Sequence, residues 1–156
     1  VDRGLHTDQQ QHAYVLGPGE SEAPEGLVLG LAAANRLQDL LVAEFAAERS
    51  GNEVLAAARQ AAATAGIEGR IYSHPIGLHG HAAGPTIGLW DAQDGVPGAG
   101  DRLIRPGTAY SIELAADVVV PEWDGQTVAI MLEEEAFFDG NRIDWLDGRQ
   151  TELHLI

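Results

Sequence analysis

The sequence predicts an α+β domain in which two helices pack on one face of a curved antiparallel sheet. Two segments in the first half have helical spacing of apolar residues, and the second half holds β-rich runs separated by Asp-Gly turns. The length of 156 residues suits a single domain. Helices grouped before the strands, rather than alternating with them, indicate α+β architecture.

The first helix is expected from about Glu25 to Glu48, after a short strand at residues 9–16 that Gly17-Pro18-Gly19 ends. Its apolar residues recur at i, i+3 and i+4 spacing, which is typical of an amphipathic helix. They are Leu27, Leu31, Ala34, Leu37, Leu41 and Phe45.

The second helix is expected at roughly residues 52–65. Ser50 followed three residues later by Glu53 has the pattern of a capping box at its start. Gly66 is a candidate for the left-handed residue that ends it.

After Gly69 the helical periodicity disappears and glycine becomes frequent. Residues 71–90 form a Gly/His-rich stretch, and residues 94–107 are expected to be a loop. The β-rich runs are Tyr110–Val120, Thr127–Phe138 and Glu152–Ile156, and the hairpin-type dipeptides are Asp124-Gly125, Asp139-Gly140 and Asp147-Gly148.

Composition excludes several classes of protein. Nine Lys and Arg against 24 Asp and Glu give a net charge of −15, so nucleic acid and anionic membrane surfaces are not expected partners. The absence of cysteine excludes disulfides, thiolate-bound zinc and a thiol nucleophile. No apolar stretch is long enough to span a membrane. The chain begins at Val1 without a signal peptide, which suggests the C-terminal part of a longer protein, with a cytoplasmic location favoured.

Histidines gather in the Gly-rich stretch. His74, His79 and His81 lie within eight residues, and Gly77 and Gly80 would let the backbone approach a ligand closely. The cluster is either a solvated surface loop or a metal site, and its residues alone leave both open.

Two glutamates lie within apolar strand patterns. Glu113 follows Tyr110-Ser111-Ile112, and Glu133 follows Val128–Leu132. A buried carboxylate is costly unless it is paired or bound to a metal. Alternatively, Glu113 lies on a solvated strand face with Ser111, and Glu133 begins a solvated cluster that continues to Glu135.

These motifs, taken in order, resemble those of the creatinase/methionine-aminopeptidase family of metallopeptidases. The segment His74–His81 fits the family's His-x-Ile-Gly-x-x-x-His pattern, and Pro106–Glu113 fits its Pro-Gly-x-x-x-(Ser/Thr)-Ile-Glu strand. Glu133–Gly140 resembles the last acidic strand, and Gly4–Asp8 resembles the strand that presents the second family aspartate. The resemblance covers nearly the whole chain and implies the pita-bread fold, with residues 1–156 forming the C-terminal part of the catalytic domain and its N-terminal part missing.

The resemblance also implies roles for five residues. Asp8, His74, Glu113 and Glu133 correspond to metal ligands, His81 to a histidine that contacts substrate, and Glu113 additionally to the proton shuttle for a bridging water. Two divalent ions are implied in the full protein, with Mn²⁺ first and Co²⁺, Fe²⁺ or Zn²⁺ as alternatives. Three carboxylates and one imidazole, without sulfur, independently suit such hard or borderline ions.

The sequence departs from the family pattern at several positions. The first metal-binding aspartate would lie about 11 residues before Asp8, upstream of Val1, and Asp2 has the wrong spacing to replace it. The family usually has an acidic residue, a proline and an arginine at the positions that are Ala82, Leu114 and Gln11 here.

The resemblance implies a peptidase of the Xaa-Pro aminopeptidase or dipeptidase type. Its substrate would be a peptide or dipeptide, and the full-length protein would be a homodimer. Two alternatives are a non-catalytic pita-bread binding module and a creatinase-like amidinohydrolase that works without metal. Retention of all five residues named above favours the peptidase.

Overall fold

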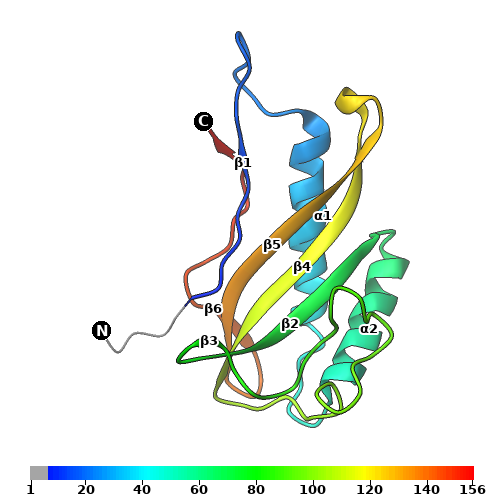
Figure 1. Ribbon diagram of the computed structural model, residues 1–156, viewed down its shortest axis with the longest axis vertical. Helices are drawn as coiled ribbons and strands as arrows, with labels where there is room; N and C mark the ends of the chain where they lie inside the picture. Colours follow the sequence, from blue (N-terminus) through cyan, green and yellow to red (C-terminus); the bar gives the residue numbers. More distant parts are fainter. Residues whose placement is uncertain (1–6) are drawn as a thin grey trace.

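The computed structural model describes residues 7–156, and within that range two helices cover one face of a five-stranded antiparallel sheet (Figure 1). The helices are α1 (Glu25–Val42) and α2 (Gly51–Thr64). The strands are β1 (Ala13–Tyr14), β2 (Gly69–Gly77), β3 (Gly80–His81), β4 (Thr108–Val120), β5 (Gln126–Phe138), β6 (Ile143–Trp145) and β7 (His154–Leu155). The main sheet has the order β3-β2-β4-β5-β6. The predicted α+β class is confirmed, and neither helix of this range is long and apolar enough to cross a membrane.

The core lies between the helices and one face of β4 and β5. These two strands pair antiparallel along their whole length, so alternate residues point to opposite faces. Ile112, Leu114 and Leu132 point toward the helices and are fully buried. They meet the apolar stripe of α1, which includes Leu37 and Leu41. The opposite face of the same strands is therefore available for polar side chains.

The predicted helices form, with one change of length. Ser50 and Glu53 make both hydrogen bonds of the capping box that begins α2. Helix α1 ends at Val42 and does not continue to Glu48. Phe45 keeps the apolar spacing but lies beyond the helix, where its ring packs edge-on against Tyr110, with the ring centroids 5.1 Å apart.

The strand β2 lies in the stretch that the sequence indicated only as Gly/His-rich. It pairs with β4 from Gly69 to Pro75, and Ser73 and His74 are buried within it. Its apolar and polar residues do not alternate cleanly, because the polar Ser73 lies with Ile71 on the buried face that packs toward the helices. Pro75, near the end of the strand, further obscures the pattern.

Two of the three predicted hairpin dipeptides connect neighbouring strands. Asp124-Gly125 joins β4 to β5 after a short 3₁₀ turn at Pro121–Trp123, and both residues have positive φ. Asp139-Gly140 joins β5 to β6. Asp147-Gly148 is different, because the strand that follows it, β7, pairs with β1 in parallel and makes no hairpin with β6.

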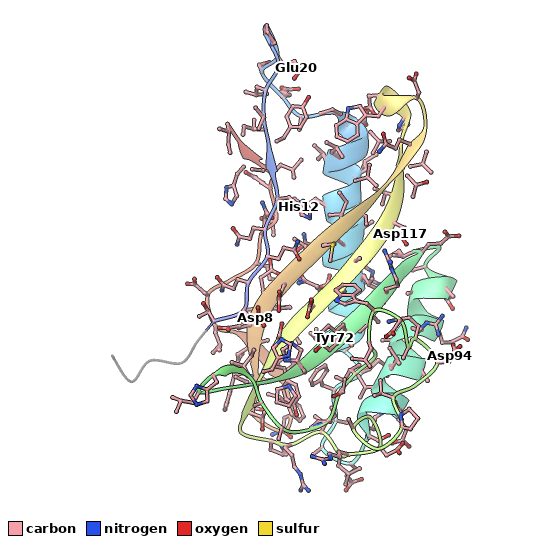
Figure 2. The ribbon with its side chains drawn as sticks, in the orientation of Figure 1. Asp8, His12, Glu20, Tyr72, Asp94 and Asp117 are labelled. Carbon is pink, nitrogen blue, oxygen red and sulfur yellow. The ribbon has the colours of Figure 1, made fainter. Side chains whose placement is uncertain are left out.

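The predicted strand at residues 9–16 divides its pairing between two partners. Ala13 and Tyr14 form β1 and pair with β7. Closer to the N-terminus, Gln10 exchanges both backbone hydrogen bonds with Glu133 of β5, with N–O distances of 3.0 and 3.1 Å. The N-terminal segment consequently lies along β5 (Figure 2). Of the segment Gly4–Asp8 that resembled a family strand, residues 4–6 lie outside the described range.

Candidate metal centre

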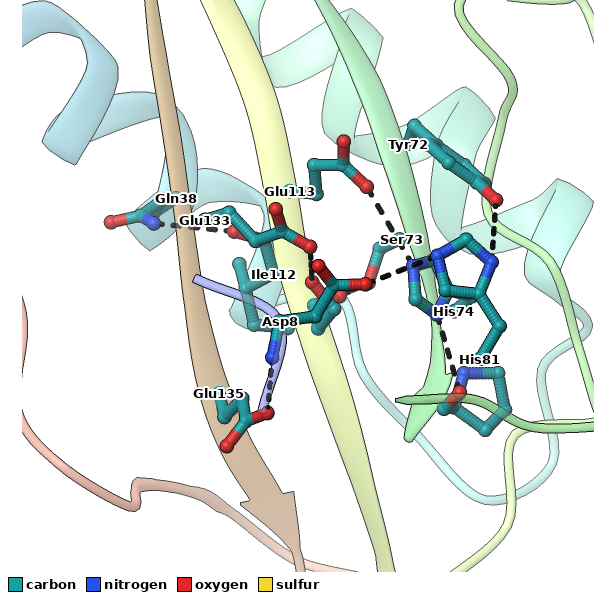
Figure 3. A network of polar contacts seen from close by, with 12 residues as sticks. Asp8, Gln38, Tyr72, Ser73, His74, His81, Ile112, Glu113, Glu133 and Glu135 are labelled. Carbon is teal, nitrogen blue, oxygen red and sulfur yellow. Dashed lines mark hydrogen bonds and ion pairs between the residues drawn. The ribbon is translucent and has the colours of Figure 1, made fainter. Parts of the chain in front are cut away.

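The site is built on the face of the sheet that points away from the helices. Glu113 of β4 lies directly opposite Glu133 of β5 in the antiparallel register, so their side chains share one face. The other neighbour of β4 is β2, where His74 lies opposite Ser111, a residue on the same face of β4 as Glu113. Three neighbouring strands therefore bring one imidazole and two carboxylates together (Figure 3).

His74 is buried, with one ring nitrogen satisfied and the other free for a ligand. Its Nδ1 lies 3.2 Å from the backbone oxygen of Pro75. Because a carbonyl only accepts, this contact places the proton on Nδ1 and leaves the lone pair on Nε2. Nε2 has no hydrogen-bond partner and lies 3.6 Å from Oε2 of Glu113. An unpartnered buried imidazole nitrogen that faces carboxylates is the arrangement expected of a metal ligand.

The three consecutive glutamates of β5 are all buried, with 6%, 1% and 7% of Glu133, Glu134 and Glu135 exposed. This excludes the alternative of a solvated cluster. Glu133 Oε1 accepts a hydrogen bond of 2.7 Å from Ser111 Oγ. Glu134 points to the helix side, where the Gln38 amide donates to it. Glu135 accepts the backbone N–H of Asp8 at 2.8 Å.

Asp8 and His81 complete the cluster from two other segments. Asp8 Oδ2 lies 3.1 Å from His81 Nε2, and the His81 ring packs on His74 with 3.8 Å between the ring centroids. Potential ligand atoms form two overlapping groups in the described range, each with all atoms within 4.8 Å of one another. One group is Asp8, His74 and His81, and the other is His74, Glu113 and Glu133.

The carboxylates raise the affinity of the site for positive charge. Burial raises the pKa of Glu133 to about 7, and the Glu113 and Asp8 charges add to this against the Ser111 hydrogen bond. Burial is the largest effect and opposes the charged form of His74, but the contact with Glu113, the Pro75 carbonyl and the Glu133 charge together outweigh it and raise the pKa of the imidazole. A bound cation would relieve the repulsion between the carboxylates.

The donor set therefore fits a divalent cation. It offers carboxylate oxygens and neutral imidazole nitrogen without sulfur, which suits Mn²⁺, Co²⁺, Fe²⁺ or Zn²⁺. The four ligands expected from the sequence, together with His81, all lie in this cluster (Figure 3). The ligand and substrate-contact roles of these residues stay predictions.

Tyr72 and Glu135 are site residues that the sequence did not reveal. Tyr72 Oη lies 3.4 Å from His81 Nδ1, and its ring centroid is 5.0 Å from that of His74 and 6.1 Å from that of Trp90. Tyr72 precedes His74 by two residues, so it would have been placed on the same face had β2 been recognised as a strand. Glu135 shares the face of Glu133 by the same alternation.

Comparison by sequence identifies no relative. No protein-family model matches the chain, and a search of curated proteins finds no similar sequence.

Comparison by structure identifies similar folds among peptidases. The chain is similar to dipeptidase PepE from Mycobacterium ulcerans, with a TM-score of 0.65 and 21% identity over 98% of this chain and 36% of that one. It is similar to the Xaa-Pro dipeptidase from Bacillus anthracis, with a TM-score of 0.65 and 18% identity over 96% of this chain and 37% of that one.

The same fold also occurs in a protein that is not described as a peptidase. The N-terminal domain of FACT complex subunit SPT16 from Cicer arietinum (chickpea) has a TM-score of 0.57 and 9% identity over 76% of this chain and 28% of that one. The chain thus spans about a third of the length of these proteins. The pita-bread fold expected from the sequence motifs, with two helices on one face of the sheet, is confirmed.

Proposed function

We propose that this chain carries the metal-binding half of a peptidase active site of the Xaa-Pro aminopeptidase or dipeptidase type. The observation that carries the proposal is the buried, unpartnered Nε2 of His74 beside the directly opposed pair Glu113 and Glu133. The substrate would be a peptide or dipeptide, consistent with a strongly acidic chain that opposes nucleic acid. For the full-length protein the proposal includes a homodimer.

Four side chains would hold a pair of divalent ions: Asp8, His74, Glu113 and Glu133. When bound, such ions lower the pKa of a water molecule and polarise the carbonyl of the scissile peptide bond. The buried position of His74 and the Ser111 hydrogen bond to Glu133 fix two of the ligands before any ion arrives. This preorganisation lowers the cost of ordering the site on binding.

Glu113 and His81 would handle protons and substrate. The Glu113 side chain is 12% exposed, so its carboxylate can reach a water molecule at the site and accept a proton from it. The His81 side chain is 58% exposed and lies over His74. Its Nε2 contacts Asp8 and its Nδ1 contacts Tyr72, so the imidazole would donate a hydrogen bond to the substrate carbonyl in exchange for one of these contacts.

A non-catalytic binding module is the second candidate. The similar fold of the SPT16 domain favours it, because that protein is described by its membership of a complex. A binding module would not need two opposed carboxylates beside an unpartnered imidazole, which cost stability when no cation is present. A metal-free, creatinase-like site would carry the same cost.

The test combines metal binding with hydrolysis in the full-length protein that contains this chain. Calorimetric titration should show that the protein binds at least one of Mn²⁺, Co²⁺ and Zn²⁺. Dipeptides with a C-terminal proline should be hydrolysed in the presence of the ion that binds. His74→Ala should abolish both. His154→Ala, a change of an exposed histidine that contacts Gln11, is the matched control and should alter neither. Failure of the wild-type protein to bind any of the three ions would refute the proposal.

A further inference from the structure

The segment that carries Asp8 lies on β5 as an incomplete strand. Among residues 7–12, the described part of this segment, only Gln10 makes a backbone pair with β5, opposite Glu133. The two residues that would form the next pairs in this antiparallel register are Asp8, opposite Glu135, and His12, opposite Met131. At both positions a side-chain atom takes the place of the backbone carbonyl that would accept the hydrogen bond. The N-terminal segment is therefore held on β5 partly by side-chain atoms, which a point substitution can remove.

The replacements are specific. At one end, the Asp8 N–H donates to the Glu135 carboxylate at 2.8 Å in place of a carbonyl oxygen. At the other end, the Met131 N–H donates to Nε2 of His12 at 2.9 Å. The imidazole thus acts as the acceptor that a strand carbonyl would otherwise supply.

Gln150 holds the far end of this segment. Its side-chain Oε1 accepts the N–H of His12 at 2.7 Å, and its Nε2 donates to the carbonyl of His12 at 2.6 Å. The amide of Gln150 therefore pairs with His12 as the backbone of a neighbouring strand would. The same Nε2 also donates to the carbonyl of Glu152 at 3.0 Å.

The backbone of Gln150 is itself anchored in the core. Its N–H donates to Glu134 Oε1 at 2.9 Å, and its carbonyl accepts from Asn35 Nδ2 of α1 at 2.8 Å. Only 4% of Gln150 is exposed. The residue consequently connects the N-terminal segment to both β5 and α1, across 138 positions of sequence from His12.

We infer that Gln150 is a positioning residue that fixes the N-terminal segment so that the Asp8 carboxylate stays at the site. We call the pairing of the Gln150 amide with the backbone of His12 the clamp. The clamp is a feature of the fold alone, whereas its consequence for metal binding rests on the proposed function. Asp8 has 37% of its side chain exposed and is held by polar contacts with Glu135 and His81. Without the clamp, the cost of ordering residues 8–12 would be added to every binding event at the site.

The chain offers a matched control in Gln93. Its amide pairs with both backbone groups of Ile71, accepting the N–H at 3.0 Å and donating to the carbonyl at 2.8 Å. These are the same two hydrogen bonds that the Gln150 amide makes with the backbone of His12. However, β2 is held independently by its long ladder with β4, so loss of the Gln93 amide leaves His74 in place.

The experiment compares the wild-type full-length protein with Gln150→Met and Gln93→Met, which keep side-chain volume and remove the amide. Hydrogen exchange of the metal-free proteins should accelerate at least tenfold at residues 8–12 in Gln150→Met alone. The Mn²⁺ dissociation constant of Gln150→Met should increase by about 10–100-fold, the range for lost supports of metal ligands. Gln93→Met should bind Mn²⁺ as the wild type does.

Each other outcome has a definite meaning. Unchanged exchange at residues 8–12 in Gln150→Met overturns the clamp. Faster exchange with unchanged Mn²⁺ affinity overturns the positioning role. If the wild type binds none of Mn²⁺, Co²⁺ and Zn²⁺, the proposed function fails, and exchange still decides the clamp. Should Gln150→Met not fold, Gln150→Asn, which keeps the amide but is one methylene too short to reach His12, provides the same comparison.

Discussion

Glu113 and Glu133 face each other across β4 and β5 as a directly opposed antiparallel pair. Like charges in this position destabilise a sheet, and here both carboxylates are largely shielded from water. The arrangement is stable only if a proton or a cation compensates the charge. The apolar residues that alternate with them, such as Ile112 and Leu132, keep the strands in register and so hold the two carboxylates together.

The first prediction concerns the pH dependence of the metal-free protein. The pKa of Glu133 rises from its ordinary 4.5 to about 7 because of burial and the Glu113 and Asp8 charges. The folded state therefore keeps a proton that the unfolded chain releases, and the free energy of unfolding falls as the pH rises through this window. The decrease should reach about 2–3 kcal/mol and level off above the folded pKa.

His74 acts in the same direction. Burial lowers its pKa most, but Glu113, the Pro75 carbonyl and Glu133 together make the net shift upward, so its stabilising contribution is lost as the pH rises through the folded pKa. Urea unfolding in EDTA at several pH values would measure the profile. Glu133→Gln should flatten it, and Glu48→Gln, a change of an exposed glutamate, should not. A wild-type profile that rises with pH over this range would contradict the assignment.

The second prediction separates metal binding from substrate contact. In active full-length protein, His81→Ala should lower kcat/KM by roughly 10²–10⁴, as expected for a lost proton donor or oxyanion partner. Metal content should stay nearly unchanged, because His74, Glu113 and Glu133 form a ligand group without His81. Glu133→Ala should lose both metal and activity.

Metal analysis and steady-state kinetics on the two variants decide this prediction. His81 also belongs to a ligand group with Asp8 and His74. If His81→Ala strips the metal, His81 is a ligand and its role as a substrate contact is wrong.

The third prediction concerns the Tyr72 hydroxyl. Tyr72→Phe removes the contact between Oη and His81 Nδ1 and keeps the ring beside His74 and Trp90. Because the variant loses one hydrogen bond that helps to orient the His81 imidazole, kcat/KM should fall by about 3–10-fold with little change in stability. Tyr14→Phe, which removes a hydroxyl bonded to Glu20 at 2.8 Å, is the control and should leave kinetics unchanged. Equal kinetics in the two variants would show that the Tyr72 hydroxyl does not orient His81.

The fourth prediction tests how closely α1 packs on the sheet. A Cβ added to Gly30 would lie 2.7 Å from Val118 Cγ2 and 3.0 Å from Ile130 Cγ1, so the helix must shift away from β4 and β5. Gly30→Ala should lower the free energy of unfolding by about 1–3 kcal/mol despite the better helix propensity of alanine. Urea denaturation measures this. Leu29→Ala, on the exposed face of the same helix, should change it far less, and an equal loss in both would contradict close packing at Gly30.

The sequence by itself determined the elements whose signals are local. The spacing of leucines specified α1, and Ser50 with Glu53 specified the start of α2, because helix faces and caps involve residues three or four positions apart. Alternation specified β4 and β5 and, with it, the shared face of Ser111 and Glu113. The motifs at His74–His81 and Pro106–Glu113, taken together, were sufficient to suggest the pita-bread fold.

The tertiary structure decided what depends on contacts between distant positions. Burial of Glu134 follows from its meeting Gln38 of α1, and nothing in a run of three glutamates distinguishes that from a solvated cluster. The strand β2 exists because β4 offers it a partner. Asp8 reaches the site because β5 and Gln150 hold its segment, through hydrogen bonds that join the two ends of the chain. The spacing of apolar residues indicates which face of a helix or strand is buried. Only the folded chain determines which other element packs on that face.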